Sequence, residues 1–391
     1  MEVGPPRHRP KAALHLLLAG SLIWAQSTPL PLPYHPAYRQ IALEALHAFY
    51  NVEFHRGFTL LDSLERRFGP YAGTAYLRAL GYAWQIELDP ATTWFDTPWE
   101  KTIARTDSLL RCCSPDPLET YFIGFANRAL YVRRLYIRGH LLRSVWEARS
   151  LIALLSGIRQ HAHTYPEMQF ELGLYEYYIA YFSANYPIMR PILSVFPPGN
   201  KDRGLSRLSQ CARDSLNYTQ TEAAYFLGYI YLYQEKNPDS ALYWLAYLVK
   251  RYPQNSLFRR MKAEALYEQK RYAEARSIIA GWLHAYEKNC LRPPCHLFFS
   301  FYPTAEAVQA YGLVGMCYRE EKNYEAAGKA FERMDSLLKT LRLFPAPTWG
   351  RLQREVAIYY KRIGRSDLAA ARLRQIVARD DVPGYLKKPL P

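Results

Sequence analysis

The chain has 391 residues, of which 49% are hydrophobic and 22% charged, a balance that excludes an intrinsically disordered protein. Its formal net charge is +15 at pH 7, and it contains 33 tyrosines. The length allows two ordinary domains or one extended repeat array, and tyrosine at this density is typical of helix–helix seams and wide grooves.

Residues 1–25 have the features of a secretory signal peptide. Arg7, Arg9 and Lys11 precede the apolar stretch 12–25, and Ala25 is a suitable residue before a cleavage site. This apolar stretch of about 14 residues is shorter than the roughly 20 that span a bilayer, although an uncleaved N-terminal anchor is the alternative. We therefore expect an exported protein of the periplasm or cell envelope, cleaved near Ala25.

Cleavage would leave 47 basic and 34 acidic side chains, a net charge of +13. That charge favours an acidic protein or peptide, an anionic glycan or an anionic membrane surface as partner. A solvated basic surface with no dedicated partner explains it equally well. Nucleic acid is the usual partner of such a basic chain, but an exported protein rarely meets it, so no nucleic acid is expected.

Residues 26–36 form a Pro-rich linker, and helical patterns follow from there to residue 165. Two helices are predicted within 42–70, where Pro70 ends the second, and another pair within 71–113. Long helical patterns occupy 117–136 and 139–160. We interpret 37–165 as degenerate helical repeats.

Residues 166–220 depart from this pattern and predict a Tyr/Pro-rich helix–loop–helix. The segment "PPGNKDRG" (197–204) lacks the spacing of a phosphate-binding loop, so we expect Asn200 to be the N-cap of the next helix. Asp202 and Arg203 are expected to order the neighbouring tyrosine-rich helix by a salt bridge or hydrogen bond.

Three carboxylates of this region, Glu171, Glu176 and Asp202, are candidates for glycoside hydrolysis, which requires two carboxyl groups across one bond. Their spacing in the sequence does not establish that arrangement. His161 and His163 lie two residues apart and do not share a helix face, so no metal site is expected. Catalytic residues and cofactors are likewise not predicted.

Residues 221–380 repeat one constellation of small and large residues. In "TEAAYFLGYIYLYQEKNPDSALYWLAYLVKRYPQ" (221–254), Gly228 and Ala241 allow two helices to approach closely, and Pro253 ends the second helix. Ala275 follows Ala241 by 34 residues. The small residues predicted at the helix crossings are Gly228, Ala241, Ala263, Ala275, Gly315, Ala327, Ala357 and Ala369.

This pattern resembles the tetratricopeptide (TPR) repeat over residues 221–380. The resemblance implies an all-α fold, an α-solenoid of antiparallel helix pairs wound into a right-handed superhelix, with residues 381–391 as a C-terminal tail. The segment 171–215 looks similar to exported bacterial TPR-like proteins and, more distantly, to the eukaryotic Iml2/TTC39-type outer-membrane repeat family. Neither family supplies catalytic residues.

In TPR arrays the first helix of each unit lines the concave face. Its groove positions fall here on tyrosines in the middle of the chain and on basic residues toward the C-terminus: Tyr225, Tyr229, Tyr233, Arg351, Arg354, Lys361 and Arg362. This surface would suit an extended peptide with acidic groups or an anionic glycan. Simple packing between adjacent helices explains the tyrosine stripe equally well.

Six cysteines lie at 112, 113, 211, 290, 295 and 317. An oxidising compartment permits disulfides, and Cys290 with Cys295 is the best candidate pair. Cys112 and Cys113 are adjacent and are not expected to bond each other.

We predict an exported TPR scaffold that mediates protein–protein interaction in the cell envelope and is not an enzyme. The first alternative is an envelope glycan-binding or glycan-cleaving α-helical protein. The second is an accessory subunit on an anionic membrane surface.

Overall fold

The structure is a computed structural model that describes residues 32–113, 117–163, 165–187, 190–290 and 303–390. The predicted signal peptide, residues 1–25, lies outside the described residues. Within the described ranges the chain is helical and has no β-strand, which confirms the all-α prediction. None of the described helices combines the length and the apolarity that a membrane span requires.

The helices are α1 (Pro36–Tyr50), α2 (Phe54–Phe68), α3 (Ala72–Leu88), α4 (Asp96–Cys113), α5 (Pro117–Ile137), α6 (Leu141–His161), α7 (Met168–Asn185), α8 (Arg190–Leu193), α9 (Lys201–Arg213), α10 (Gln220–Tyr229), α11 (Pro238–Arg251), α12 (Ser256–Glu268), α13 (Tyr272–Asn289), α14 (Thr304–Glu320), α15 (Tyr324–Leu338), α16 (Ala346–Arg362) and α17 (Ser366–Val377). Shorter turns are η1 (Leu32–Tyr34), the π-helical η3 (Ile230–Gln234) and η4 (Gly384–Lys387).

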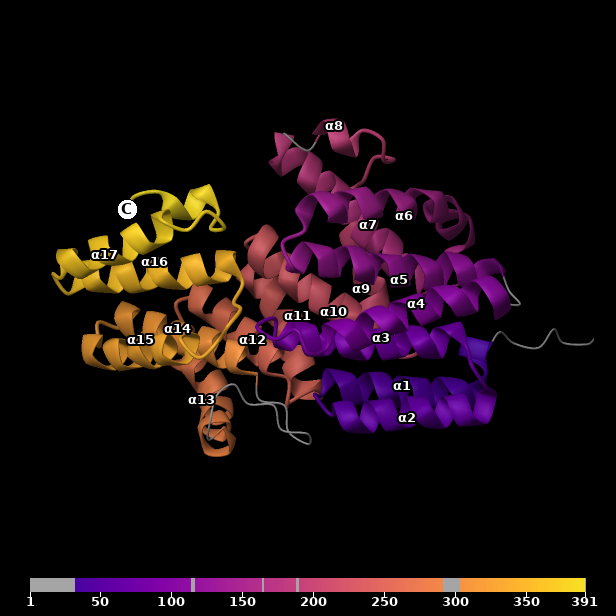
Figure 1. The fold of residues 1–391 in the computed structure, drawn as a ribbon, viewed down its shortest axis with the longest axis horizontal. Coiled ribbons are helices and arrows are strands. Elements are labelled where there is room, and N and C mark those ends of the chain that lie inside the picture. The colour runs from indigo at the N-terminus through magenta and orange to yellow at the C-terminus, as the bar shows by residue number, and fades with distance from the viewer. Residues whose placement is uncertain (1–31, 114–116, 164, 188–189, 291–302, 391) are drawn as a thin grey trace, which may run out of the picture.

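Consecutive helices pack in pairs (Figure 1). The pairs are α1 with α2, α3 with α4, α5 with α6, α7 with α9, α10 with α11, α12 with α13, α14 with α15 and α16 with α17. First helices of neighbouring pairs also touch, as α1 does with α3 and α12 with α14. This arrangement is an α-solenoid of helix pairs, as predicted.

The turn inside a pair has the same backbone geometry in both halves of the chain. One residue adopts a positive φ, and the next amide donates to a carbonyl five residues back: Arg271 N to Leu266 O at 2.9 Å, and Glu53 N to Ala48 O at 2.8 Å. This is the Schellman arrangement that satisfies the last carbonyls of a helix. The positive-φ residues in these turns are Val52, Gly139, Lys236, Lys270, Lys322 and Gly364.

Asparagine begins several helices and supplies the acceptor that their first amides need. The Asn237 side chain accepts from Ser240 N at 3.0 Å, and that of Asn323 accepts from Ala326 N at 3.2 Å. Asn200 caps α9 by accepting from Arg203 N at 2.8 Å, which confirms the predicted N-cap.

The eight small residues predicted at the helix crossings are all buried. A methyl group added to Gly228 would lie 2.9 Å from Leu245 Cδ2, and one added to Gly315 would lie 2.7 Å from Phe331 Cε1. Side chains at these places would therefore push the paired helices apart. The boundaries predicted for the individual domains remain predictions.

The N-terminal helices also pack directly against the middle of the array. Five aromatic side chains from distant parts of the sequence form an aromatic hub, which we define as Tyr50, Trp84, Tyr225, Tyr252 and Phe258. The Trp84 ring centroid lies 5.4 Å from that of Tyr50, 5.3 Å from that of Tyr225 and 5.6 Å from that of Phe258. One continuous core thus joins α1 and α3 to α10 and α12.

Two polar contacts fix the hub. The Trp84 indole nitrogen donates to Glu222 Oε1 at 2.6 Å, and Asn255 Nδ2 donates to the Tyr50 carbonyl at 2.9 Å. Asn255 also caps α12, because its side-chain oxygen accepts from Phe258 N at 3.1 Å. The same amide therefore starts α12 and attaches it to α1.

The tyrosine-rich helix α7 is attached to α9 through Glu176. This carboxylate accepts from Arg203 Nε at 2.8 Å and from Arg207 Nε at 3.2 Å. Tyr177 donates to Glu235 Oε1 at 2.5 Å, and Lys201 contacts the other oxygen of Glu235 at 2.8 Å. The expected ordering of the tyrosine helix by Arg203 is present.

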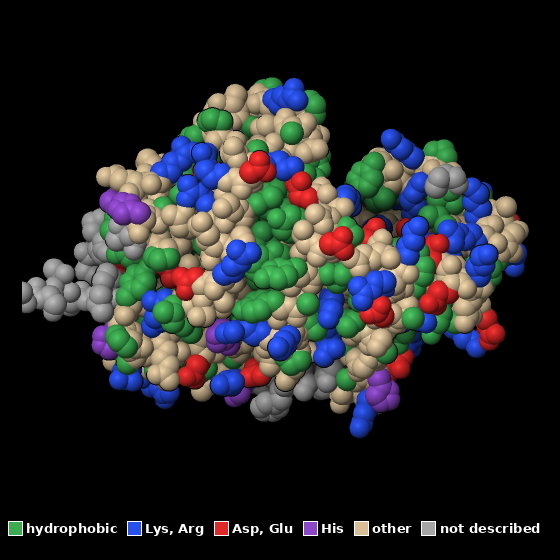
Figure 2. Space-filling view, turned by 180° about the vertical axis from the view of Figure 1, so that it is seen from behind, with side chains coloured by type: hydrophobic (Ala, Val, Ile, Leu, Met, Phe, Trp, Pro, Cys, Tyr) green, Lys and Arg blue, Asp and Glu red, His purple; other side chains and the backbone are tan. Residues whose placement is uncertain are grey.

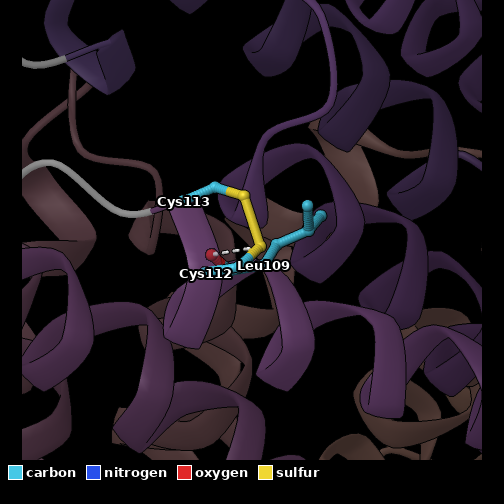
Figure 3. Close-up of a disulfide and its surroundings, with 3 residues drawn as sticks. All are labelled: Leu109, Cys112 and Cys113. Atoms are coloured by element: carbon cyan, nitrogen blue, oxygen red, sulfur yellow. Dashed lines mark hydrogen bonds between the residues drawn. A yellow bond between two sulfur atoms is a disulfide. The ribbon is translucent and has the colours of Figure 1, made fainter.

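Cys112 and Cys113 form a disulfide at the end of α4, with sulfurs 2.30 Å apart (Figure 3). The prediction that these neighbours would not bond is wrong, because α4 ends at Cys113 and both exposed side chains can turn toward each other there. Cys290 is also a disulfide cysteine. Its predicted partner Cys295 lies outside the described residues, so that pairing remains a prediction.

Candidate binding groove

One face of the molecule carries a notch. Figure 2 shows it between the lobe that contains α7 and α8 and the lobe that contains α16 and α17, with hydrophobic side chains extending from it toward the middle of that face. The C-terminal end of α5 and the π-helical turn η3 belong to the same region. This hollow is the candidate site.

Six tyrosines in or next to α5, α7, α10 and η3 lie near one another, and we call them the tyrosine groove. Tyr136 of α5 is 65% exposed and Tyr186, which follows α7, is 47% exposed, whereas the others are half-buried. Ring centroids lie 4.8 Å apart between Tyr229 and Tyr233, and 6.3 Å apart between Tyr181 and Tyr186. The groove residues are Tyr136, Tyr178, Tyr181, Tyr186, Tyr229 and Tyr233.

The hydroxyls of these tyrosines raise one another's pKa, which places the rings in one environment. The pKa of Tyr229 is raised to about 12, mainly by burial and then by the nearby hydroxyl of Tyr136 and the carboxylate of Glu87. Burial is also the main cause of the raised pKa of Tyr136, followed by the hydroxyls of Tyr186 and Tyr385. The phenols therefore stay protonated at neutral pH and can donate hydrogen bonds.

Charged residues beneath the first part of the groove are paired. Arg133 of α5 lies 3.0 Å from Glu87, and its guanidinium stands 5.1 Å from the centroid of the Phe226 ring. The Tyr225 hydroxyl donates to Glu87 at 3.0 Å. These contacts satisfy the carboxylate inside the molecule.

A second ion cluster lies beneath η3. Arg260 contacts Glu264 at 2.7 Å and Glu306 at 2.8 Å, and Tyr233 donates to Glu264. Burial opposes ionisation of Glu264, but the charges of Arg260 and Arg351 and the hydrogen bonds from Tyr233 and Arg260 together outweigh it and lower the pKa of that carboxyl. The floor of the groove therefore presents aromatic rings above charges that are already compensated.

The structure separates the three tyrosines predicted for the concave face. Tyr229 and Tyr233 lie in the groove, but Tyr225 is only 2% exposed and belongs to the aromatic hub. The sequence pattern placed them on one open face because they recur every fourth residue. Instead, Trp84 of α3 and Arg133 of α5 pack against the Tyr225 ring, so the inner wall is closed at that point.

The predicted basic end of the groove is also different. Arg354 donates to backbone carbonyls of the C-terminal segment, and Arg362 lies 2.9 Å from Glu320. Both guanidinium groups therefore already have partners within the chain. Arg351 and Lys361 are exposed, and Arg351 stands 4.0 Å from Glu264. The basic residues are thus spread along α16 and mostly committed to internal contacts.

Sequence reasoning missed four groove tyrosines: Tyr136, Tyr178, Tyr181 and Tyr186. The signal for three of them was present, since "YEYYIAYFSANY" (175–186) spaces tyrosines along one side of α7. Nothing local could indicate that α5 and η3 would meet that helix.

Of the three carboxylates considered for catalysis, Glu171 and Glu176 lie in the packing, whereas Asp202 is exposed in the first turn of α9. Glu171 is 4% exposed, and burial raises its pKa well above the usual value. Glu176 is held by two arginines of α9. Among the described residues, no group of three His, Cys, Asp or Glu side chains could hold a metal ion.

Comparison with known proteins finds a match to the tetratricopeptide repeat family over residues 232–289, from η3 to the end of α13. That span contains Ala241, Ala263 and Ala275, three of the predicted crossing residues. The match therefore indicates tetratricopeptide-type repeat sequence at residues 232–289. Repeats of this kind are typical of protein-interaction scaffolds.

A solved structure titled "Crystal Structure of Rap Protein Complexed with Competence and Sporulation Factor" is similar to the chain, with 12% sequence identity and a TM-score of 0.45. The alignment covers 87% of this chain and 96% of that one. A likeness at this level carries no argument about function. The curated proteins contain no match to the chain.

Proposed function

We propose that this protein is an exported interaction scaffold that binds an extended segment of a partner protein in the tyrosine groove, without catalysis. One observation carries the proposal. Tyrosines in or next to α5, α7, α10 and η3 lie near one another, whereas Tyr225, one helical turn from Tyr229, is sealed in the core. The groove is thus a place where aromatic surface stays accessible.

The chemistry of the groove matches a peptide backbone. A tyrosine ring supplies a large contact area with little side-chain freedom to lose, and its hydroxyl can hydrogen-bond at the edge of an apolar contact. Because burial keeps phenols such as Tyr229 protonated, they offer donors to the carbonyls of an extended chain. A segment laid across the groove would stack on the rings and present its carbonyls to those hydroxyls.

The charges around the groove further restrict the kind of segment that it can bind. The carboxylates beneath the groove already pair with Arg133 and Arg260, so the centre of a bound segment needs no charge. Arg351 and Lys361 are exposed on α16, and an acidic residue would fit best at the flank of the segment beside that helix.

Export is supported by the signal-like residues 1–25 and by the cysteines. Disulfides persist in oxidising compartments, and Cys112, Cys113 and Cys290 are all disulfide cysteines. Mass spectrometry of the protein from fractionated cells would test this proposal. We expect a chain that begins near Gln26 in the periplasmic or envelope fraction; an intact N-terminus in the cytoplasm would contradict it.

Selection from a displayed random peptide library would test the binding function. We expect selected peptides to bind the purified chain, and Tyr136→Ala with Tyr229→Ala to weaken binding at least tenfold by calorimetry. Tyr243→Ala is the matched control, since Tyr243 is 62% exposed on α11 but outside the groove. Equal binding by the groove variant, or no selected peptide, would overturn the proposal.

A further inference from the structure

The α16 end of the groove already holds a peptide segment, the C-terminal end of the chain itself. Arg354 Nη1 donates to the carbonyl of Leu386 at 3.4 Å and to that of Lys388, and Nη2 donates to the carbonyl of Pro389 at 2.8 Å. One guanidinium thus binds three carbonyls of one segment. All three bonds go to the backbone, so they do not depend on the side chains of that segment.

The bound segment begins with the 3₁₀ helix η4 (Gly384–Lys387) and becomes extended at Lys388. Lys388 has φ −66° and ψ 152°, close to the values of a polyproline II helix. Pro389 fixes its own φ and has no backbone N–H. A polyproline II backbone leaves its carbonyls free of internal hydrogen bonds, so Arg354 can bind those of Lys388 and Pro389, and little conformational entropy is lost on binding.

An apolar contact sets the register of the segment. Leu386 is 7% exposed and packs with Val382 in a small cluster to which Trp349 of α16 contributes. Gly350 makes room for them, because an added Cβ would lie 2.8 Å from Val382 Cγ1 and 3.0 Å from Leu386 Cδ1. The site therefore consists of one leucine pocket next to one guanidinium.

This site continues into the tyrosine groove. Tyr385, directly before Leu386, is 64% exposed, and its hydroxyl is close enough to Tyr136 of α5 to influence that tyrosine. Figure 1 shows the C-terminal segment beside α16, in the lobe that borders the notch. A peptide that ran from α5 toward α16 would meet the position that Leu386 and Pro389 now hold.

We propose that the α16 end of the groove is a binding site for segments in which a leucine in a short 3₁₀ turn is followed three residues later by a proline in extended backbone, and that residues 384–390 occupy it as an internal ligand. This inference rests on the proposed function and names the class of segment that the groove takes. A partner segment of the same chemistry would displace the C-terminal segment and continue over the tyrosines.

The test uses the full chain with a loosened C-terminal segment. In Leu386→Ser the anchor is lost, and a synthetic peptide of residues 384–391 is then titrated by calorimetry. We expect this variant to bind the peptide at least tenfold more tightly than the wild-type chain, whose own segment competes. Adding Arg354→Ala to the variant should abolish binding, and a peptide that itself carries Leu386→Ser should not bind.

A second variant keeps the test informative if Leu386→Ser does not fold. Lys388→Gly with Pro389→Gly removes the polyproline II preference and leaves the Leu386 pocket intact, so the melting temperature should stay within a few degrees of wild type. It should also bind the added peptide more tightly than wild type. Equal affinity of wild type and both variants, or binding that survives Arg354→Ala, would overturn the site.

The result also separates this inference from the proposed function. Library peptides that depend on Tyr136 and Tyr229 would support the tyrosine groove even if the 384–391 peptide failed to bind. Dimers of the wild-type chain that the peptide disperses would show that the occupant comes from a second copy, and would contradict an internal ligand.

Discussion

Tyr225 and Tyr229 lie one turn apart on α10, yet they belong to different regions of the molecule. Tyr225 is 2% exposed in the aromatic hub, where Trp84 and Phe258 surround it. Tyr229 is half-buried and packs edge to face against Tyr233, which follows it by four residues in η3. The same residue type thus serves packing where other helices cover it, and remains available for binding where none does.

Comparison of the hub with the groove also shows which contacts bury part of the inner face of the helix array. The hub joins α1 and α3 to repeats that follow them by more than 130 residues, through Trp84 with Glu222 for example. The groove begins beside this hub, where α3 supplies Glu87 to its floor and Tyr229 stays half-buried. Its accessibility is therefore a consequence of where the hub ends.

Substituting the two tyrosines separately should give the largest difference. Tyr225→Ala removes a buried ring and should lower the free energy of unfolding by about 3–5 kcal/mol, whereas Tyr229→Ala should cost about 1 kcal/mol. Thermal and denaturant unfolding followed by circular dichroism would measure both. Similar losses for the two variants would show that the two regions are not distinct.

Substitution of two asparagine caps should give a smaller difference in the free energy of unfolding. Asn255→Ala removes the cap of α12 and the bond to the Tyr50 carbonyl, so we expect a loss of about 2–3 kcal/mol. Asn237 caps α11 but lies on the surface, and its replacement by alanine should cost about 1 kcal/mol. Unfolding experiments on both variants measure the difference, and equal costs would argue against the attachment of α12 to α1.

The acids of the two regions should respond oppositely to pH. Burial raises the pKa of Glu222 in the hub, so its favourable contribution is present below about pH 4.5 and is lost as pH rises through the folded-state pKa. Relative to wild type, Glu222→Gln should therefore gain melting temperature as pH rises from 4.5 to 8. The outcome that would contradict this assignment is a difference that does not change with pH.

Glu264 beneath the groove should show the reverse. Arg260, Arg351 and Tyr233 together lower its pKa despite burial, so its contribution is present above about pH 4.5 and is lost as pH falls through the lowered folded-state pKa. Glu264→Gln should be less stable than wild type at pH 7, and the deficit should shrink as the solution is acidified. A deficit that persists in acid would argue against an ionised Glu264.

The sequence predicts the helix pairs and the helix starts well. Small residues such as Gly228 and Ala241 recur in successive helix pairs, and Asn200 has the sequence context of a cap, so helix pairs and their starts are visible in short windows. The hub is not visible in this way, because the contact of Trp84 with Tyr225 joins residues that no short pattern relates.

The same limit explains the errors at the site. Helical spacing alone does not show that α3 covers Tyr225. Nor does it show that Arg354 binds the carbonyls of Leu386 and Pro389, which follow α17 in the chain. Tyr136 was missed because its neighbours in the groove come from α7 and η3. Each of these outcomes depends on how distant helices meet.

Tyrosine nitration mapped by mass spectrometry tests the distinction between hub and groove most directly. Exposed Tyr136 and Tyr186 should be nitrated rapidly, and a peptide selected on the chain should protect them, whereas Tyr225 should remain unmodified with or without peptide. Nitration of Tyr225 at the rate of Tyr136, or full nitration of Tyr136 and Tyr186 in the presence of saturating peptide, would contradict the account.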